Sequence, residues 1–340
     1  MKKGTEIMGK KYDVIALGEI LIDFTPCGKS EVGQRLFEQN PGGAPANVLT
    51  ALSRFGRKTA FIGKIGRDMH GNFLKEVLVE NGVSVEGLVE DENVFTTLAF
   101  VALSDTGERS FSFARKPGAD TMLTEAEVKR ELISESKVFH IGSLSLTAEP
   151  AKQATLKALA YAKEAGCIIS YDPNYRAPLW DSKADAIREM RSVIPFVDVI
   201  KLSDEETELL TDVAEPEGAA KKLIEQGVKI VAVTLGANGA LVATKGGYVH
   251  IAGFESKVVD TTGAGDSFWG GFLHKLLEDS IRLQEEVSQA EPLQAEMLEK
   301  ITLEDAMEFT KFGNAVASLC VEKRGAIPAM PRLEEVMKRV

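Results

Sequence analysis

The sequence has few cysteines and no long hydrophobic run. Its 340 residues include only 3 Cys, at Cys27, Cys167 and Cys320, with no C-x-x-C pair. This spacing excludes a disulfide framework and a zinc ribbon. The 4 His also lack metal-ligand spacing. No stretch approaches the ~20 apolar residues that a membrane-spanning helix needs.

Positive charge is also scarce. The chain has 40 Lys+Arg against 51 Asp+Glu, which gives a formal net charge of -11. Nucleic acids and anionic membranes attract basic surfaces, so neither is expected as a partner. The apolar stretch 14–24 contains two acids and no small-residue cleavage site, so it predicts β structure rather than a signal peptide. We therefore expect a cytoplasmic protein, and an anionic substrate would need local positive charge or backbone donors.

Short β-branched runs alternate with helical patterns along the chain. The predicted strands are 13–17, 59–62, 137–141, 167–171, 197–202 and 230–234, and the predicted helices are 46–55, 71–80, 150–165, 183–193, 205–210 and 218–226. This alternation predicts an α/β fold with a mostly parallel sheet and helices on both faces. The very polar segment 281–300 predicts a helical surface insertion. We interpret residues 1–340 as a single domain.

Two segments interrupt this alternation. Residues 96–104 and 109–114 alternate between apolar and polar and are joined by Asp105-Thr-Gly-Glu, which predicts a β-hairpin. Residues 19–38 have a similar strand–loop–strand pattern. These segments are either ordinary edge hairpins or a small sheet over the carboxyl edge of the main sheet, where ligands bind in such folds. The second interpretation predicts a lid formed by about 19–38 and 95–116.

The string Asp260-Thr-Thr-Gly-Ala-Gly-Asp266 carries the strongest chemical signal. It follows the strand-like Ser256–Val259 and precedes a helical pattern. Gly263 and Gly265 would let backbone N–H groups approach a ligand at a helix N-terminus, where an anion is favoured. Asp266 is then either a charge at a helix end or a general base beside an anion hole, as phosphoryl transfer requires. The string matches neither a Walker loop nor a Rossmann fingerprint.

A second glycine site lies at Pro41-Gly-Gly-Ala-Pro-Ala-Asn47. Gly42 and Gly43 allow close approach of a ligand to the backbone, and Asn47 offers both a donor and an acceptor to sugar hydroxyls. The alternative interpretation is a tight turn with an asparagine near a helix start.

These two motifs, in this order, resemble those of the ribokinase/PfkB carbohydrate kinase family over roughly residues 12–332. Further strings resemble fructokinases of bacteria and plants: GEILIDF at 18–24, FIGKIG at 61–66, GSLSL at 142–146, YDPNYR at 171–176 and GAIP at 325–328. The resemblance implies a ribokinase-like three-layer α/β/α fold with a small β-sheet lid. It also implies transfer of the γ-phosphoryl group of Mg-ATP to the 6-hydroxyl of fructose.

The resemblance assigns roles to matching positions. Asp266 would be the catalytic base, and Gly263, Ala264 and Gly265 would form the anion hole. The sugar-binding positions would be Asp23, Gly42, Gly43, Asn47, Phe100, Arg109, Arg115 and Arg176. The nucleotide-binding positions would be Lys201, Ser203, Thr234, Gly236, Gly239 and Asn314.

Two cations are implied in the same way. Magnesium would be held indirectly through Glu206, and a potassium ion would lie near Asp260 and Thr262. The family motif Asn-x-x-Glu reads Ser203-Asp-Glu-Glu206 in this chain, so the glutamate is retained and serine replaces asparagine.

Alternatives remain open from the sequence. Kinases for 2-keto-3-deoxygluconate, ribose or a nucleoside share the anion-hole motif, although Ala44-Pro45 favours a fructokinase. A non-catalytic regulator that binds a sugar or a nucleotide would keep the same fold. The expected partners are fructose, ATP and a second copy of the chain, because pairing through the lid would cover its strand edges.

Overall fold

The computed structural model describes residues 10–103, 109–287 and 295–340. A central sheet has the strand order β13-β12-β11-β10-β9-β8-β1-β4-β5. The strands from β11 to β5 pair in parallel, whereas β12 and β13 are antiparallel additions at one edge. The strands are β1 (Tyr12–Leu17), β4 (Thr59–Gly66), β5 (Val83–Asp91), β8 (Ser136–Ile141), β9 (Ile168–Tyr171), β10 (Val199–Ser203), β11 (Ile230–Thr234), β12 (Ala240–Thr244) and β13 (Gly247–Ile251).

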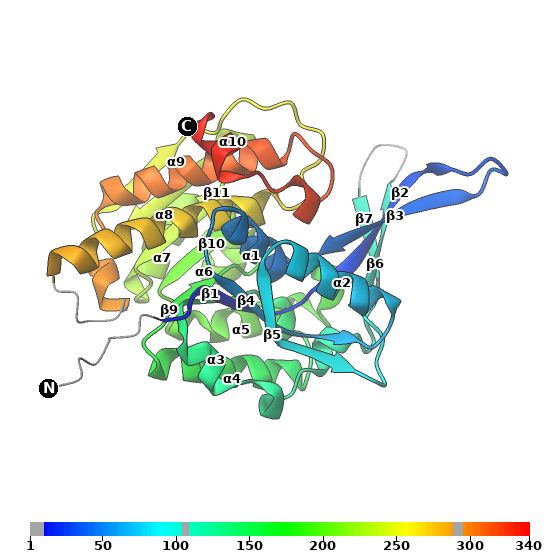
Figure 1. The fold of residues 1–340 in the computed structure, drawn as a ribbon. Coiled ribbons are helices and arrows are strands. Elements are labelled where there is room, and N and C mark those ends of the chain that lie inside the picture. The colour runs from blue at the N-terminus through cyan, green and yellow to red at the C-terminus, as the bar shows by residue number, and fades with distance from the viewer. Residues whose placement is uncertain (1–9, 104–108, 288–294) are drawn as a thin grey trace, which may run out of the picture.

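Helices cover both faces of this sheet (Figure 1). One face is covered by α1 (Ala44–Arg54), α2 (Met69–Glu80), α8 (Ala264–Val287) and α9 (Leu303–Cys320), with α10 (Leu333–Met337) against α9. The other is covered by α3 (Arg130–Ser134), α4 (Ala151–Glu164), α5 (Lys183–Ser192), α6 (Thr207–Thr211) and α7 (Pro216–Glu225). Each face has its own apolar core, so the predicted three-layer α/β fold is confirmed. Within the described ranges, no helix is both long and apolar enough to cross a membrane.

The local sequence explains these elements. Every residue of β4 is buried, as expected for a parallel strand with helices on both faces. The helix α1 ends at Arg54, one residue before the predicted end, and Gly56 just beyond it takes a φ of 82°, a conformation that glycine adopts without strain.

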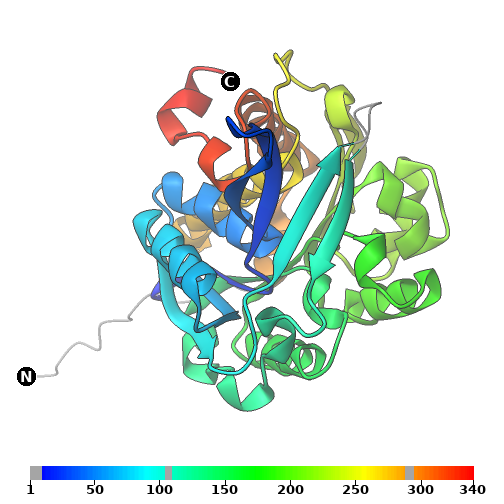
Figure 2. The same ribbon diagram turned by 90° about the vertical axis from the view of Figure 1, so that its right-hand side faces the viewer.

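A second, four-stranded sheet has the order β3-β2-β6-β7 and projects from the main body (Figures 1 and 2). We call it the small sheet. Its strands are β2 (Leu21–Lys29), β3 (Arg35–Gly42), β6 (Leu98–Leu103) and β7 (Arg109–Ala114). The central pair, β2 and β6, is parallel, with Asp23 opposite Ala99. The two segments that interrupt the βα alternation therefore form one sheet, while the predicted turn at 105–108 lies outside the described residues.

Two local predictions need correction. Ser256–Val259 is not a strand, because the N–H of Val259 donates to the carbonyl of Val321, just past α9, instead of to a neighbouring strand. The polar segment 281–300, predicted to be helical throughout, is α-helical to Val287 as the end of α8 and forms a 3-10 helix at Ala295–Lys300; residues 288–294 lie outside the described part.

Candidate active site

The N-terminus of the 24-residue helix α8 forms a glycine-lined turn. Gly263 takes a φ of 76°, and a Cβ there would lie 2.9 Å from the Cβ of Ala326. A Cβ on Gly265 would lie 2.9 Å from the Nζ of Lys201. The first turn of a helix has N–H groups without intrahelical acceptors, so this end favours an anion. The turn thus combines backbone donors with an adjacent ammonium group.

Asp266 lies in the first turn of α8 and is 8% exposed. Its Oδ2 accepts a hydrogen bond of 2.7 Å from the Nδ2 of Asn47 on α1. Burial and then the nearby charge of Asp172 raise the pKa of Asp266 to about 6, against the opposing effects of Lys201 and Asn47. A carboxylate with this pKa is ionised at neutral pH and is a stronger base than an ordinary aspartate.

A buried ion pair lies beside this helix end. The Nζ of Lys201, in the middle of β10, is 2.9 Å from the Oδ2 of Asp172, which follows β9. Burial alone would lower the pKa of Lys201, but the charges of Asp172, Glu206 and Asp266 outweigh it and raise the pKa. Lys201 therefore supplies permanent positive charge. Asp172 was missed by the sequence analysis, although its place just after a predicted strand was a usable signal.

The predicted sugar-binding residues Asp23, Gly42, Gly43 and Asn47 come together with Asp266. Burial raises the pKa of Asp23 to about 6, while Arg176 lowers it and Asp266 raises it further. A Cβ on Gly42 would collide with the Oδ2 of Asp23. Asp23 and Asp266 thus share a desolvated region. The exposed guanidinium of Arg176 lowers the pKa of both carboxylates.

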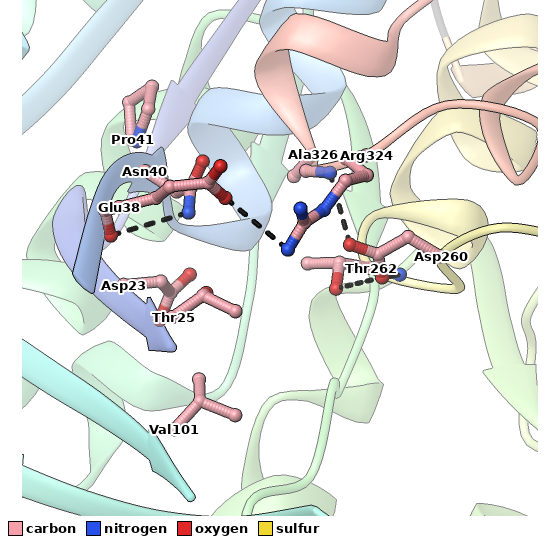
Figure 3. Close-up of a pocket in the computed structure, with 11 residues that line it drawn as sticks. Asp23, Thr25, Glu38, Asn40, Pro41, Val101, Asp260, Thr262, Arg324 and Ala326 are labelled. Atoms are coloured by element: carbon pink, nitrogen blue, oxygen red, sulfur yellow. Dashed lines mark hydrogen bonds and ion pairs between the residues drawn. The ribbon is translucent and has the colours of Figure 1, made fainter. Parts of the chain in front are cut away.

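A cleft separates the small sheet from the main body, as Figure 3 shows. It is lined on one side by Asp23, Thr25, Glu38, Asn40, Pro41 and Val101, and on the other by Asp260, Thr262, Arg324, Gly325 and Ala326. An ion pair of 3.5 Å between Arg324 Nη2 and Glu38 Oε2 crosses the cleft. The sequence analysis missed Asn40 and Arg324, because only the folded chain brings β3 next to the C-terminal segment.

Phe100, a predicted sugar-binding residue, is not among the residues that line this cleft. It pairs with Phe24 in the sheet register, and the two rings stack with centroids 5.2 Å apart. Successive side chains of a strand point to opposite faces, and the neighbouring residues Asp23 and Val101 line the cleft. Phe100 and Phe24 therefore lie on the other face of the small sheet.

The three predicted arginines have different surroundings. Arg115 is buried, with Nε 2.8 Å from Asp120 Oδ2, Nη1 2.8 Å from Thr147 Oγ1 and Nη2 2.9 Å from the Leu144 carbonyl. It anchors the base of the small sheet, which contradicts its predicted place over the sugar. Arg109 begins β7, and its side chain lies outside the described part of the chain. Of these three arginines, Arg176 is the one whose exposed side chain acts on the carboxylates of Asp23 and Asp266.

The predicted nucleotide-binding positions lie along the carboxyl edge of β10 and β11 and beside β13. Thr234 ends β11, and Gly236 and Gly239 belong to the loop before the antiparallel β12. A Cβ on Gly239 would collide with the carbonyl of Ile251. The amide of Asn314 on α9 donates to the carbonyls of Ile251 and Ala252, each at 3.1 Å. Asn314 thus fixes the chain that leaves β13.

Glu206 is engaged in holding two loops together. Its Oε2 accepts from the N–H (2.8 Å) and hydroxyl (2.9 Å) of Ser203, and its Oε1 accepts from the N–H of Tyr175 (2.6 Å). These bonds fit an indirect role toward a metal. No cluster of three His, Cys, Asp or Glu suited to a metal occurs in the described ranges. Magnesium bound with a nucleotide keeps waters and takes phosphate oxygens, so it needs few protein ligands.

Asp260 organises the loop before α8. Its Oδ1 accepts from the N–H (2.9 Å) and hydroxyl (2.7 Å) of Thr262, and its Oδ2 accepts from the N–H of Gly325 at 3.1 Å. Oxygen atoms of this kind suit a hard cation. The predicted potassium-site residues are therefore adjacent to one another and to the anion-binding turn.

A buried carboxylate in the first turn of a helix, next to N–H groups that favour an anion, would suit phosphoryl transfer to a hydroxyl group. The comparison with known families agrees. The chain belongs to the pfkB family of carbohydrate kinases, whose model matches residues 11–333.

Individual relatives are similar over nearly the whole chain. Fructokinase-2 of Solanum lycopersicum is 42% identical over 327 residues, covering 95% of this chain and 94% of that protein. The crystal structure of a fructokinase with bound ATP from Xylella fastidiosa has a TM-score of 0.85 and 32% identity, covering 96% and 97% of the two chains. The crystal structure of a fructokinase double mutant from Vibrio cholerae O395, with fructose, ADP and potassium ion bound, has a TM-score of 0.82 and 30% identity. The match covers 97% of this chain and 99% of that chain.

Proposed function

We propose that the protein is a fructokinase, which transfers the γ-phosphoryl group of Mg-ATP to the 6-hydroxyl of D-fructose and releases fructose 6-phosphate and ADP. The observation that carries this proposal is the hydrogen-bonded pair Asn47–Asp266 at the anion-binding end of α8, next to Asp23. The similarity to fructokinases from a plant and from bacteria supports fructose as the sugar.

In this mechanism, fructose lies in the cleft and ATP lies along the carboxyl edge of the central sheet. Asp266 takes the proton from the 6-hydroxyl as the hydroxyl oxygen attacks the γ-phosphorus, and the bond from the γ-phosphorus to the bridging oxygen breaks to release ADP. The N–H groups of the turn Gly263–Gly265, with the ammonium of Lys201, stabilise charge on the transferring group. Magnesium bound with ATP would neutralise phosphate charge, and Glu206 would act indirectly by fixing the loops at Ser203 and Tyr175. A potassium ion at Asp260 and Thr262 would fix the loop before α8.

A sugar panel tests this function. We expect ADP release, measured by a coupled assay, to be faster with fructose than with ribose, 2-keto-3-deoxygluconate or adenosine. Faster turnover of one of these compounds would identify it as the substrate in place of fructose. The protein would still be a kinase. Fructose binding without ADP release, with magnesium present, would favour a non-catalytic regulator.

Asp23 is the residue that we expect to hold the sugar hydroxyls. Asp23→Asn should raise KM for fructose by ~10-fold or more, because hydrogen bonds to a charged acceptor are stronger than those to a neutral one. KM for ATP should stay unchanged. Thr25→Val is the matched control, since Thr25 lines the same cleft without a charge. An unchanged KM for fructose in Asp23→Asn would remove this residue from the sugar site.

We further propose a homodimer that forms through the small sheet. Its face away from the cleft carries an aromatic cluster of Phe24, Phe37 and Phe100, and Phe37 and Phe100 are 42% and 39% exposed. The outer strands β3 and β7 also have open edges. A second copy would cover both features. The cytoplasmic location remains a prediction.

Light scattering tests the dimer. The wild type should have twice the mass of one chain, and Phe100→Asp should shift it toward the monomer, because a buried carboxylate without a partner destabilises an interface. Tyr248→Asp is the control, since Tyr248 is an exposed aromatic residue on β13 at the far edge of the central sheet. A monomeric wild type at assay concentration would contradict the dimer.

A further inference from the structure

Glu19 is a buried acid without an assigned role. It lies in the turn between β1 and β2, where the chain passes from the central sheet to the small sheet, and it is 2% exposed. Its Oε1 accepts the N–H of Ala44 at 2.8 Å. Its Oε2 is buried and has no hydrogen-bond partner among the described residues. Such a carboxylate costs stability, so a contribution to function would explain its presence.

The start of α1 explains why an acceptor is needed at this point. Helices usually begin with a residue whose side chain accepts a backbone N–H, but Gly43 occupies that position and has no side chain. Glycine is required there, because its φ is 115° and a Cβ would collide with the carbonyl oxygen of Glu19. The backbone of Glu19 thus prevents a capping side chain at position 43. The side chain of Glu19 accepts a hydrogen bond at the helix start instead.

This replacement cap acts on the helix that holds the catalytic hydrogen bond. The N–H of Asn47 donates to the carbonyl of Gly43 at 2.9 Å, which places Asn47 one turn into α1. Its side chain reaches Asp266 at 2.7 Å. A small shift of the helix start would lengthen this bond, and catalysis is sensitive to shifts of this size.

Charged groups surround both ends of this connection. Burial raises the pKa of Glu19 to about 7, against the opposing effects of its own N–H and the N–H of Ala44; Asp120 raises this pKa further and Arg115 lowers it. Asp266 is faced by Asp172, Lys201, Arg176 and Asp23 as well as by Asn47. The hydrogen bond from Asn47 lowers the pKa of Asp266, so the titration of Asp266 reports whether Asn47 is in place.

We propose that Glu19 is a positioning residue, which acts through the N–H of Ala44 and through α1 to hold Asn47 against Asp266. The catalytic meaning of this connection rests on the proposed kinase function. The geometric connection itself can be tested without any substrate.

The experiment compares Glu19→Met, which removes the acceptor, with Glu19→Gln, which keeps an acceptor oxygen. Glu19→Met should lower kcat/KM for fructose by ~10-fold or more and leave KM for ATP unchanged. It should also raise the pKa of Asp266, and Asn47→Ala should do the same. This pKa is measured by 13Cγ NMR of labelled aspartate, with the Asp266 signal assigned by means of Asp266→Asn. Glu19→Gln should remain close to the wild type in both measurements.

Two further variants complete the design. Asp13→Leu is the matched control, because Asp13 accepts the N–H of Lys58 at 2.9 Å near the opposite end of β1, and it should leave the titration of Asp266 unchanged. Ala44→Pro removes the donor and is tolerated at the first position of a helix, so it should reproduce the effect if Glu19→Met does not fold. An unshifted pKa of Asp266 in Glu19→Met or Ala44→Pro would overturn the proposal. If the wild type fails to phosphorylate fructose, the proposed function fails, but the titration still decides the role of Glu19.

Discussion

Asp266→Asn should lower kcat by at least ~100-fold, the contribution expected of a positioned general base. Fructose and ATP should still bind, because asparagine has the same shape and its side-chain oxygen can accept the hydrogen bond from Asn47. The measurement is steady-state kinetics together with calorimetric titration of each substrate. Turnover close to that of the wild type would show that Asp266 is not the base.

A stability measurement separates this loss from unfolding. The pKa of Asp266 is raised to about 6, above its ordinary value of 3.8, so ionisation of Asp266 destabilises the folded state. This destabilisation is present at neutral pH and decreases as the pH falls through about 6. Asparagine removes the charge. Asp266→Asn should therefore melt no lower than the wild type at pH 8, and a lower melting temperature would mean that the kinetic loss has a structural cause.

Lys201→Met should impair both stability and turnover. It removes the ammonium beside Gly265 and leaves the fully buried Asp172 without its partner. Breaking a buried ion pair costs about 3–5 kcal/mol, which chemical denaturation measures as the free energy of unfolding. Loss of a charge that stabilises the transferring phosphoryl group should lower kcat by ~100-fold or more.

The double variant Lys201→Met/Asp172→Asn separates the two effects. Neutralising both partners removes the unpaired buried charge, so most of the lost stability should return. Turnover should remain low, because the positive charge at the anion-binding turn is still missing. If turnover returns together with stability, Lys201 has only a structural role.

The sequence predicts well what local patterns determine. Buried β-branched runs and helical spacing gave the parallel sheet and its layers, since each element carries its own signal. The glycine string at 260–266 marked the anion-binding turn because only glycine fits at Gly263. The resemblance to known kinases then placed Asn47 and Asp23 beside Asp266, and they lie in one region of the structure.

Features that depend on register and long-range pairing could not be predicted. Phe100 was assigned to the sugar, yet a one-residue step along β6 separates the cleft face from the aromatic face. Arg115 was assigned to the sugar, but its guanidinium is hydrogen-bonded to Asp120 and Thr147. The pair Lys201–Asp172 and the cap from Glu19 to Ala44 join residues on separate elements, and no local pattern indicates such contacts.

The pH dependence of kcat/KM for fructose tests most directly whether Asp266 is the base. It should be measured in Asp23→Asn, because Asp23 also has a pKa of about 6, and with saturating magnesium, so that the nucleotide is its magnesium complex throughout. Glu19→Gln should show the same decrease in kcat/KM at low pH as the protein with Glu19, because this decrease does not come from titration of Glu19. We expect a one-proton decrease in kcat/KM as the pH falls below about 6, where Asp266 becomes protonated. A profile that stays flat from pH 5 to pH 8 would contradict it.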